Sequence, residues 1–416
     1  MKVLVVGSGG REHAIAWKLL QSPNVDRVWC TPGNGGTATL DNCQNLVIAV
    51  DDFAGIAKAV KDNNIDLVAV GPEVPLSLGI ADYLQQQDIA VFGPVKAGAE
   101  IEASKSWAKD LMIEGGIPTA KSATFTDVES AKVYVRKEGA PIVVKADSLA
   151  AGKGVIVAMT LDEAINAVEE LFGQGFTTLV IEEFLVGEEA SVLAFTDGKT
   201  IIPLLAAQDH KRIGEGDTGK NTGGMGAYAP APLVTPEIMQ RIETEVLQPT
   251  IATFNKRGID YKGILYAGLM ITPKGAPKIV EFNCRFGDPE TQAVLPLLDT
   301  PLDELMLACI NRELDRVNLQ WKSGSAVCVV AAAGGYPDAY EKGKVITGLD
   351  KVTDAIVFHA GTKLAEEQIV TNGGRVLGIT AIGSNFENAI AKVYPAVEQI
   401  SFDKMYYRRD IGHLNI

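Results

Sequence analysis

Several side chains near residue 280 could bind a metal ion and a phosphate group. Residues 278–290 read KIVEFNCRFGDPE, and the first part of this segment has the pattern of a β-strand. Side chains two residues apart on a strand share one face, so Glu281 and Asn283 present two oxygen ligands to one point, which suits Mg²⁺ bridging nucleotide phosphates. If the strand continues, Arg285 lies on the same face and could contact a transferring phosphoryl group or a substrate carboxylate. An ordinary polar strand face is the alternative, but the polar RFGDPE continuation favours a site.

A glycine-rich segment near the start of the sequence could hold a small phosphate. The segment GSGGREH, residues 7–13, follows an apolar strand and opens a helix, which places backbone N–H groups and a positive dipole end at one point. A dinucleotide fingerprint is disfavoured, because Glu12 occupies the position of its third glycine and the second strand ends without a ribose-binding acid. Arg11 instead suits a phosphate monoester. The alternative is that these glycines only permit tight packing of strand against helix.

A second glycine-rich segment, LAAGKGV at residues 149–155, joins two expected strands. It is not a Walker loop, because no Ser or Thr follows Lys153 and no helix begins there. Its small residues would still let backbone N–H groups approach a triphosphate, as a lid that excludes water; a plain hairpin turn is the alternative. Lys145, in the apolar strand before it, needs a partner charge, which a nucleotide phosphate would supply.

Three further segments carry weaker signals. The strand expected at residues 179–185 ends in Glu182 and Glu183 and could contact adenine and ribose, although a solvated acidic strand end is the more ordinary explanation. Glu73 follows the fourth expected strand, at the edge where open α/β sheets bind ligands, and could contact a hydroxyl or an amine. The QDHKR segment and the long glycine-rich loop expected at residues 212–226 add positive charge and free N–H groups.

The elements that must position these groups fall into several units. Apolar runs alternate with helical patterns over the first hundred residues, which predicts a parallel βαβ sheet with strands at 3–6, 25–30, 45–49, 65–70 and 89–92. A short helix opens near Ser104, and residues 123–195 predict an α+β unit. A helix at 235–257 and strands at 263–272 and 278–282 follow. The last ninety residues predict a small domain of strands with one helix near 385–395.

Composition excludes several classes of protein. The chain has 416 residues and a formal net charge of −14 at pH 7, which argues against a nucleic-acid surface or a polybasic membrane contact. The five cysteines include no C-x-x-C pair, so we expect neither a disulfide framework nor a zinc site. No apolar stretch approaches the roughly 20 residues that span a bilayer. We expect a cytoplasmic monomer that binds small molecules and neither nucleic acid nor membrane.

Together these segments resemble one enzyme family. The order GSGGREH, GPE, FGP, SKxxAK, VVKAD, AAGKGV, EEFL, QDHKR, NTGGMGAYAPAP and VEFNCRFGDPETQ is similar to that of the phosphoribosylamine–glycine ligases of the ATP-grasp superfamily, over nearly the whole chain. The resemblance implies an α/β and α+β multi-domain fold. Its expected parts are a Rossmann-like substrate domain at residues 1–102, a connecting helical segment at 103–122, a small ATP-grasp lid domain at 123–190, a large ATP-grasp domain with the metal strand at 191–325, and a C-terminal closing domain at 326–416.

The same resemblance implies the reaction and the residues that serve it. The family joins glycine to 5-phosphoribosylamine with ATP, through glycyl phosphate, and yields glycinamide ribonucleotide, ADP and phosphate in de novo purine biosynthesis. The implied ATP contacts are Lys105, Lys145, Gly152, Lys153, Gly154, Glu182, Glu183, Phe184, Leu185 and Glu189. The implied ligands of Mg²⁺ or Mn²⁺ are Glu281 and Asn283. Phosphoribosylamine would face Gly9, Gly10, Arg11, Glu12, His13 and Glu73, and glycine would face Asp209, Lys211, Gly223, Gly224, Met225, Gly226 and Arg285. Lys145 and Arg285 are the expected catalytic residues, because they neutralise charge on the transferring group.

Three other functions remain open on the sequence. One is a different ATP-grasp reaction, such as carboxylation of a purine intermediate or of biotin. Another is a nucleotide-sensing module that binds ATP without turnover, although the metal strand and the second phosphate loop count against it. The third is an NAD oxidoreductase.

Overall fold

The apolar runs of the first hundred residues form one parallel sheet. The computed structural model describes residues 1–149 and 154–413. The first sheet has the order β3-β2-β1-β4-β5, and its strands are β1 (Lys2–Gly7), β2 (Arg27–Pro32), β3 (Cys43–Asn45), β4 (Leu67–Val70) and β5 (Val91–Phe92). The expected strand at 45–49 is wrong: the chain leaves the sheet after Asn45, and the hydroxyl of Thr31 donates to the carbonyl of Ile48 instead.

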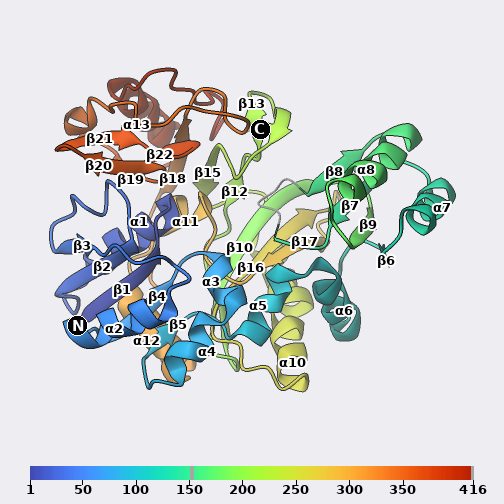
Figure 1. Cartoon of the computed structure of the whole chain (residues 1–416), viewed down its shortest axis with the longest axis horizontal. Helices are drawn as coiled ribbons and strands as arrows, with labels where there is room; N and C mark the ends of the chain where they lie inside the picture. Colours follow the sequence, from blue (N-terminus) through green and yellow to red (C-terminus); the bar gives the residue numbers. More distant parts are fainter. Residues whose placement is uncertain (150–153, 414–416) are drawn as a thin grey trace.

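Six helices accompany this sheet and lead out of it. They are α1 (Gly10–Leu19), α2 (Phe53–Asn63), α3 (Glu73–Leu78), α4 (Ile80–Gln85), α5 (Lys96–Ala103) and α6 (Lys105–Gly115). Ser104 caps α6, because its side chain accepts a hydrogen bond from the backbone of Trp107. The helix predicted near Ser104 is therefore confirmed, and it carries the chain from the first sheet to the next unit (Figure 1).

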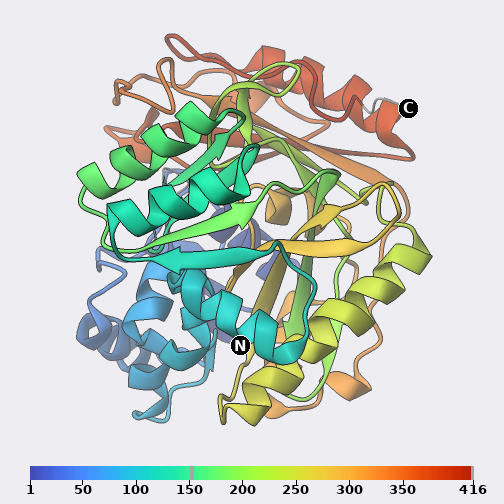
Figure 2. The same cartoon turned by 90° about the vertical axis from the view of Figure 1, so that its right-hand side faces the viewer.

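The second unit is a four-stranded antiparallel sheet with two helices. Its strands have the order β6-β9-β7-β8 and are β6 (Ser122–Phe125), β7 (Ile142–Ala146), β8 (Val155–Ala158) and β9 (Leu179–Glu183). The helices α7 (Val128–Glu138) and α8 (Leu161–Gly173) lie side by side on one face of this sheet (Figure 2). The two strands expected on either side of residues 149–155 are confirmed, since β7 and β8 pair antiparallel from Ile142 to Lys145.

The third sheet contains the strand that carries Glu281 and Asn283. It has the order β11-β10-β16-β17, with β10 (Glu188–Thr196), β11 (Ile201–Pro203), β16 (Gly263–Ile271) and β17 (Pro277–Asn283). The helix expected at 235–257 is interrupted: α9 (Pro236–Arg241) runs into a π-helical turn (Ile242–Leu247) and then α10 (Gln248–Lys256). Pro249 explains the interruption, because it has no N–H to donate to the preceding turn.

A fourth sheet joins the centre of the chain to its last ninety residues. Its order is β12-β15-β18-β22-β19, with β12 (Gln208–Asp209), β15 (Gly226–Ala229), β18 (Ser325–Ala332), β19 (Ile356–His359) and β22 (Arg375–Gly383). The hairpin β20 (Thr362–Ala365) and β21 (Gln368–Thr371) and the helix α13 (Phe386–Gln399) complete this region (Figure 1). The two short helices α11 (Glu290–Val294) and α12 (Leu302–Asn311) precede β18. One sheet thus combines strands from before and after residue 325, where the expected large ATP-grasp domain ends.

The expected long loop at 212–226 is partly wrong. Residues in it form a hairpin of β13 (Arg212–Gly214) and β14 (Thr218–Asn221). The buried guanidinium of Arg408 donates to the carbonyl of Arg212 at 2.9 Å and to Asp217 at 2.8 Å. A partner 196 residues away therefore stabilises this hairpin, which no local pattern predicts.

One apolar cluster joins the first sheet to the third, whereas the second unit has a core of its own. Leu4 of β1, Leu111 of α6, Ala267 of β16 and Ile279 of β17 belong to one buried cluster. The first sheet and the sheet that carries the metal strand are therefore held in a fixed relation. No helix within residues 1–149 and 154–413 is long and apolar enough to cross a membrane.

Candidate active site

The metal strand holds its side chains as the sequence predicts. Glu281 and Asn283 stand opposite Gly268 and Tyr266 of β16, two steps apart on one face of β17. The guanidinium of Arg285 donates to Oδ1 of Asn283 at 3.0 Å, so the third side chain also reaches this face. Burial raises the pKa of Glu281, but Lys211 and Lys145 outweigh it and hold that pKa below its ordinary value. Glu281 is therefore ionised at neutral pH.

These residues fit a divalent cation that brings other ligands with it. Within the described ranges, no group of three or more His, Cys, Asp and Glu side chains could hold a metal by itself. Mg²⁺ commonly takes one or two protein oxygens and completes its shell with water and substrate phosphates. The carboxylate of Glu281 and the amide oxygen of Asn283 match that donor set.

Two buried lysines share one carboxylate beside the metal strand. Nζ of Lys145, on β7, lies 2.8 Å from Glu182 and donates to the carbonyl of Val280 on β17 at 3.1 Å. Nζ of Lys109, on α6, lies 3.1 Å from the other oxygen of Glu182. The prediction that a phosphate supplies the partner charge of Lys145 is corrected here, because Glu182 already supplies it. Lys109 ends the SKxxAK segment quoted above, but the sequence assigned it no role, because its partner Glu182 is distant along the chain.

Lys211 and Lys105 bring further positive charge to this face. Nζ of Lys211 lies 2.7 Å from Glu189 of β10 and 3.8 Å from Glu281. Burial lowers the pKa of Lys211, but the adjoining carboxylates outweigh it and raise the pKa well above its ordinary value. Lys105 opens α6 and donates to the carbonyl of Ser148 at 2.9 Å. Burial is also the main influence on Lys105 and lowers its pKa, although Glu281 opposes the shift.

The other residues expected at the nucleotide lie along β9 and the β7–β8 hairpin. Glu183 is exposed and pairs with Lys278 of β17 at 3.1 Å. Phe184 and Leu185 are partly buried in the segment between β9 and β10. The carbonyl of Gly154 accepts from the backbone of Ala146 at 2.7 Å. Gly152 and Lys153 lie outside the described residues.

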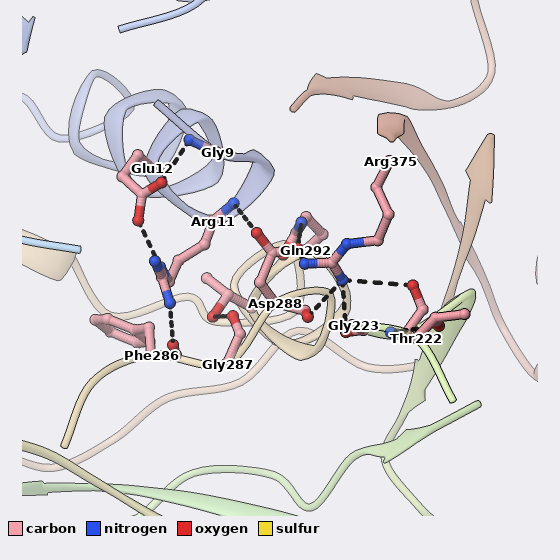
Figure 3. A network of polar contacts seen from close by, with 12 residues as sticks. Gly9, Arg11, Glu12, Thr222, Gly223, Phe286, Gly287, Asp288, Gln292 and Arg375 are labelled. Carbon is pink, nitrogen blue, oxygen red and sulfur yellow. Dashed lines mark hydrogen bonds and ion pairs between the residues drawn. The ribbon is translucent and has the colours of Figure 1, made fainter. Parts of the chain in front are cut away.

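The first glycine-rich loop encloses a side chain of its own. The carboxylate of Glu12 accepts from the backbone of Gly9 at 2.6 Å and pairs with Nε of Arg11 (Figure 3). A Cβ at Gly71 would lie 2.0 Å from Oε1 of Glu12, so the absent side chain there makes room for this carboxylate. Glu12 thus takes the N–H that an anion could bind, and Arg11 is buried, with a further bond to the carbonyl of Phe286 at 3.1 Å. Gly10 faces the amide of Gln292.

His13 lies in the contact with the last ninety residues. It is buried, and its Nδ1 accepts from the backbone of His359 at 2.8 Å. Burial, together with a smaller effect of the nearby His359, lowers the pKa of His13 to about 3. His13 is therefore neutral and turned toward β19.

Asp288 connects the first loop to the glycine-rich segment at 223–226. Its carboxylate accepts from the backbone of Arg11 at 3.3 Å and from Gln292 at 2.8 Å. Arg375 of β22 donates to the carbonyl of Asp288 at 2.7 Å and to that of Gly223 at 2.6 Å (Figure 3). Arg375 and Gln292 were not predicted, because single polar residues in β22 and α11 have no distinctive local spacing.

The remaining residues of the 223–226 segment are packed closely. A Cβ at Gly224 would lie 2.5 Å from Pro289, and one at Gly226 would lie 2.6 Å from the carbonyl of Cys328. Met225 is buried, and its backbone donates to the carbonyl of His210 at 2.7 Å. The close packing at these residues therefore fixes the segment in place rather than opening a binding surface beside it.

Asp209 and Glu73 each lie near a cation of the site, Lys211 and Arg285 respectively. Burial raises the pKa of Asp209 to about 8, against the lowering influence of Lys211. Glu73 begins α3 and lies 3.4 Å from Nε of Arg285. Glu12 and His13 thus turn away from the site into internal contacts. The other predicted residues that the structure brings together, with Glu73 beside them, are Lys105, Lys145, Glu182, Lys211, Glu281, Asn283 and Arg285.

Comparison with known proteins identifies the family. Family models for the three domains of phosphoribosylglycinamide synthetase match residues 1–102 (N domain), 103–291 (ATP-grasp domain) and 326–414 (C domain). The chain belongs to this family.

Relatives and solved structures agree with this membership. The chain is 62% identical to the phosphoribosylamine–glycine ligase of Nostoc sp. and 61% identical to that of Synechocystis sp., over 99% of each chain. It is also similar to the crystal structure of a phosphoribosylamine–glycine ligase from Thermotoga maritima, with a TM-score of 0.86, 35% identity, and coverage of 99% of this chain and 100% of that one. Biotin carboxylase from Campylobacter jejuni shares the fold, with a TM-score of 0.73 at 12% identity, covering 99% of this chain and 94% of that one. The fold class predicted from the sequence is confirmed.

Proposed function

We propose that this chain joins glycine to 5-phosphoribosylamine at the expense of ATP and forms glycinamide ribonucleotide, ADP and phosphate. This is a step of de novo purine biosynthesis. The observation that carries the proposal is the convergence of Lys105, Lys145 and Lys211 on the strand face of Glu281 and Asn283. Family membership over nearly the whole chain supports it.

The reaction needs two steps and no covalent enzyme intermediate. The glycine carboxylate attacks the γ-phosphorus of ATP, which gives glycyl phosphate and ADP. The amine of 5-phosphoribosylamine then attacks the glycyl carbonyl and expels phosphate, and the amine proton goes to solvent or phosphate. Lys145 and Arg285 neutralise charge on the transferring group and orient it. Burial raises the pKa of Cys284 well above its ordinary value, so that thiol stays protonated and is a poor nucleophile.

We propose Mg²⁺ or Mn²⁺ as the metal, held by Glu281 and Asn283. Such a cation neutralises phosphate charge when bound. Within this scheme the nucleotide lies along Lys105, Gly152 to Gly154, Glu182 to Leu185 and Glu189. Here Glu182 acts through Lys109 and Lys145, and Glu183 to Leu185 offer backbone groups to adenine.

Two further sets of residues complete the proposed site. Glycine lies near Arg285, Asp209, Lys211 and residues 223–226. Phosphoribosylamine lies near Gly9 to Arg11 and Glu73, while Glu12 and His13 shape that loop from behind. We also propose a cytoplasmic monomer, which agrees with five free cysteines and an acidic chain.

A coupled assay of ADP formation tests the proposal. We expect ADP to form only when ATP, a divalent cation, glycine and freshly prepared 5-phosphoribosylamine are all present, and mass spectrometry to detect glycinamide ribonucleotide. Bicarbonate in place of glycine tests a carboxylation, and NADH fluorescence tests an oxidoreductase. ADP formation with bicarbonate, or none with glycine, contradicts the proposal.

A further inference from the structure

Just beyond the end of strand β17, a carboxylate from another element accepts a hydrogen bond from the backbone. Backbone pairing with β16 stops at Asn283, so the next backbone N–H, that of Cys284, has no strand partner among residues 1–149 and 154–413. It donates to Oε2 of Glu102, on α5, at 2.8 Å. The carboxylate of Glu102 therefore accepts the hydrogen bond that a neighbouring strand would otherwise accept. The chain bends at Cys284 and Arg285, and the guanidinium of Arg285 still reaches the face of Glu281 and Asn283, because it donates to Oδ1 of Asn283.

The other oxygen of Glu102 holds the Arg285 side chain itself. Nη2 of Arg285 lies 2.7 Å from Oε1 of Glu102 and donates at 3.0 Å to Oδ1 of Asn283. A single carboxylate thus fixes the backbone of one residue and the guanidinium of the next. Through that guanidinium it also orients the amide oxygen that faces the metal.

Arg285 has a second carboxylate partner, and the two differ in character. Glu102 is only 7% exposed and makes hydrogen bonds with both oxygens. Glu73 is 29% exposed and lies 3.4 Å from Nε of Arg285, which has no hydrogen-bond partner in the described part of the chain. Nε of Arg285 is thus a donor without a hydrogen bond in the described ranges, and the more exposed, unbonded Glu73 is the partner that a substrate carboxylate would displace to reach it.

We propose that Glu102 is a positioning residue for Arg285 and Asn283, and that Glu73 is the partner that the substrate carboxylate displaces. Glu102 is the permanent counter-ion of Arg285. It aims the guanidinium at the substrate and holds the metal-facing oxygen of Asn283. The substrate part of this inference rests on the proposed function, whereas the metal part does not.

The variant Glu102→Gln tests the role, with Glu100→Gln as the matched control. Gln can still accept from Cys284 but lacks the charge that holds Arg285. Glu100 lies two residues earlier on α5, and no ion pair of its side chain occurs among the described residues. We expect Glu102→Gln to raise KM for glycine about 10-fold or more, in the range typical of lost ligand-orienting partners, while KM for ATP changes less. Glu102→Asp should recover part of the loss, and Glu100→Gln should match the wild type.

Binding of Mn²⁺ in the presence of ADP, followed by electron paramagnetic resonance, gives a readout that does not need turnover. We expect about 10-fold weaker Mn²⁺ binding in Glu102→Gln and wild-type binding in Glu100→Gln. Unchanged Mn²⁺ binding together with unchanged KM for glycine overturns the proposal. So does a lower thermal stability with a reduced kcat but unaltered KM and Mn²⁺ binding, because that pattern marks a purely structural ion pair. If the wild type forms no ADP with glycine, the proposed function fails, and the Mn²⁺ measurement still decides the role of Glu102.

Discussion

Three lysines of the site, Lys109, Lys145 and Lys211, are already paired with carboxylates of the chain. Glu182 lies between Lys109 and Lys145, and Lys211 lies beside Glu189. Burying these cations without partners would be costly, so the internal carboxylates keep the site folded before a ligand arrives. A bound phosphate must therefore share these lysines with their carboxylates, which limits how tightly the nucleotide alone can bind.

The variant Glu281→Gln tests the metal strand. The substitution keeps the shape of the side chain but removes the ionised oxygen, so we expect turnover to fall by more than about 100-fold through lost metal binding. ADP release at saturating Mg²⁺ measures the effect. The matched control is Glu100→Gln on α5, a residue outside the proposed site with no ion pair among the described residues, and it should change the rate little. Near-normal ADP release by Glu281→Gln contradicts the assignment.

The variant Glu182→Gln tests the shared counter-ion. It leaves Lys109 and Lys145 buried without a negative partner, so we expect the free energy of unfolding to fall by about 3–5 kcal/mol. The control Glu183→Gln breaks only the exposed pair with Lys278 and should cost less than about 1 kcal/mol. Urea denaturation followed by circular dichroism compares the two. Equal effects would show that Glu182 is not the buried counter-ion.

At the scale of the elements, the site depends on contacts between the ends of strands and helices. The first turn of α1 is filled by the carboxylate of Glu12, which accepts from Gly9. Asp288, just beyond the metal strand, accepts from the backbone of Arg11 in the same turn. Arg375 extends from β22 to the segment that begins at Gly223. The helix terminus is thus a junction between elements as well as part of a substrate surface.

The variant Arg375→Ala tests this junction. It removes the donor to three backbone carbonyls, those of Gly223, Gly224 and Asp288, and a charge-assisted hydrogen bond is worth about 1.5–3 kcal/mol. We expect the free energy of unfolding to fall by about that amount and proteolysis near residue 223 to accelerate. Lys363→Ala, an exposed change in the same region, serves as the control. The junction plays no such role if the proteolysis rates of the two variants agree.

At the scale of the whole molecule, the first sheet and the last ninety residues meet through two buried histidines. His13 accepts from the backbone of His359, and their ring centroids lie 5.5 Å apart. Burial lowers the pKa of His359 to about 4 and is the main cause that lowers the pKa of His13 to about 3. Both rings are therefore neutral in the folded protein throughout the physiological range.

This pair predicts how stability depends on pH. An unfolded histidine has a pKa near 6.5, so the neutral folded rings stabilise the protein fully above that pH. As the pH falls from 6.5 toward 4, each histidine should cost about 1.4 kcal/mol of unfolding free energy per pH unit. Thermal unfolding of the wild type and of His13→Asn between pH 7 and pH 5 measures this, and the variant should show a shallower decline. His413→Asn, an exposed histidine, should leave the slope unchanged, and an equally steep decline in His13→Asn would contradict the prediction.

Local periodicity predicted the elements that bury one face or both. The strands β1, β16 and β17 and the helix α6 lie close to where the sequence places them, because their apolar spacing sets the burial of the elements directly. The hairpin in residues 212–226 could not be predicted, since it depends on the buried guanidinium of Arg408. The same reason explains why Lys109, Glu102 and Arg375 were missed: each acts through a partner far away in the sequence.

The sequence by itself determined the fold class, the strand on which Glu281 and Asn283 share one face, and the family to which the chain belongs. These features follow from spacing along one strand and from local residue order. Only the tertiary structure decided which charge balances which. It placed Glu182 beside Lys145 and Glu102 beside Arg285, and it enclosed Glu12 in its own loop. The reason is that the Coulomb energy between two charges depends on their separation and burial in space, which chain order does not fix.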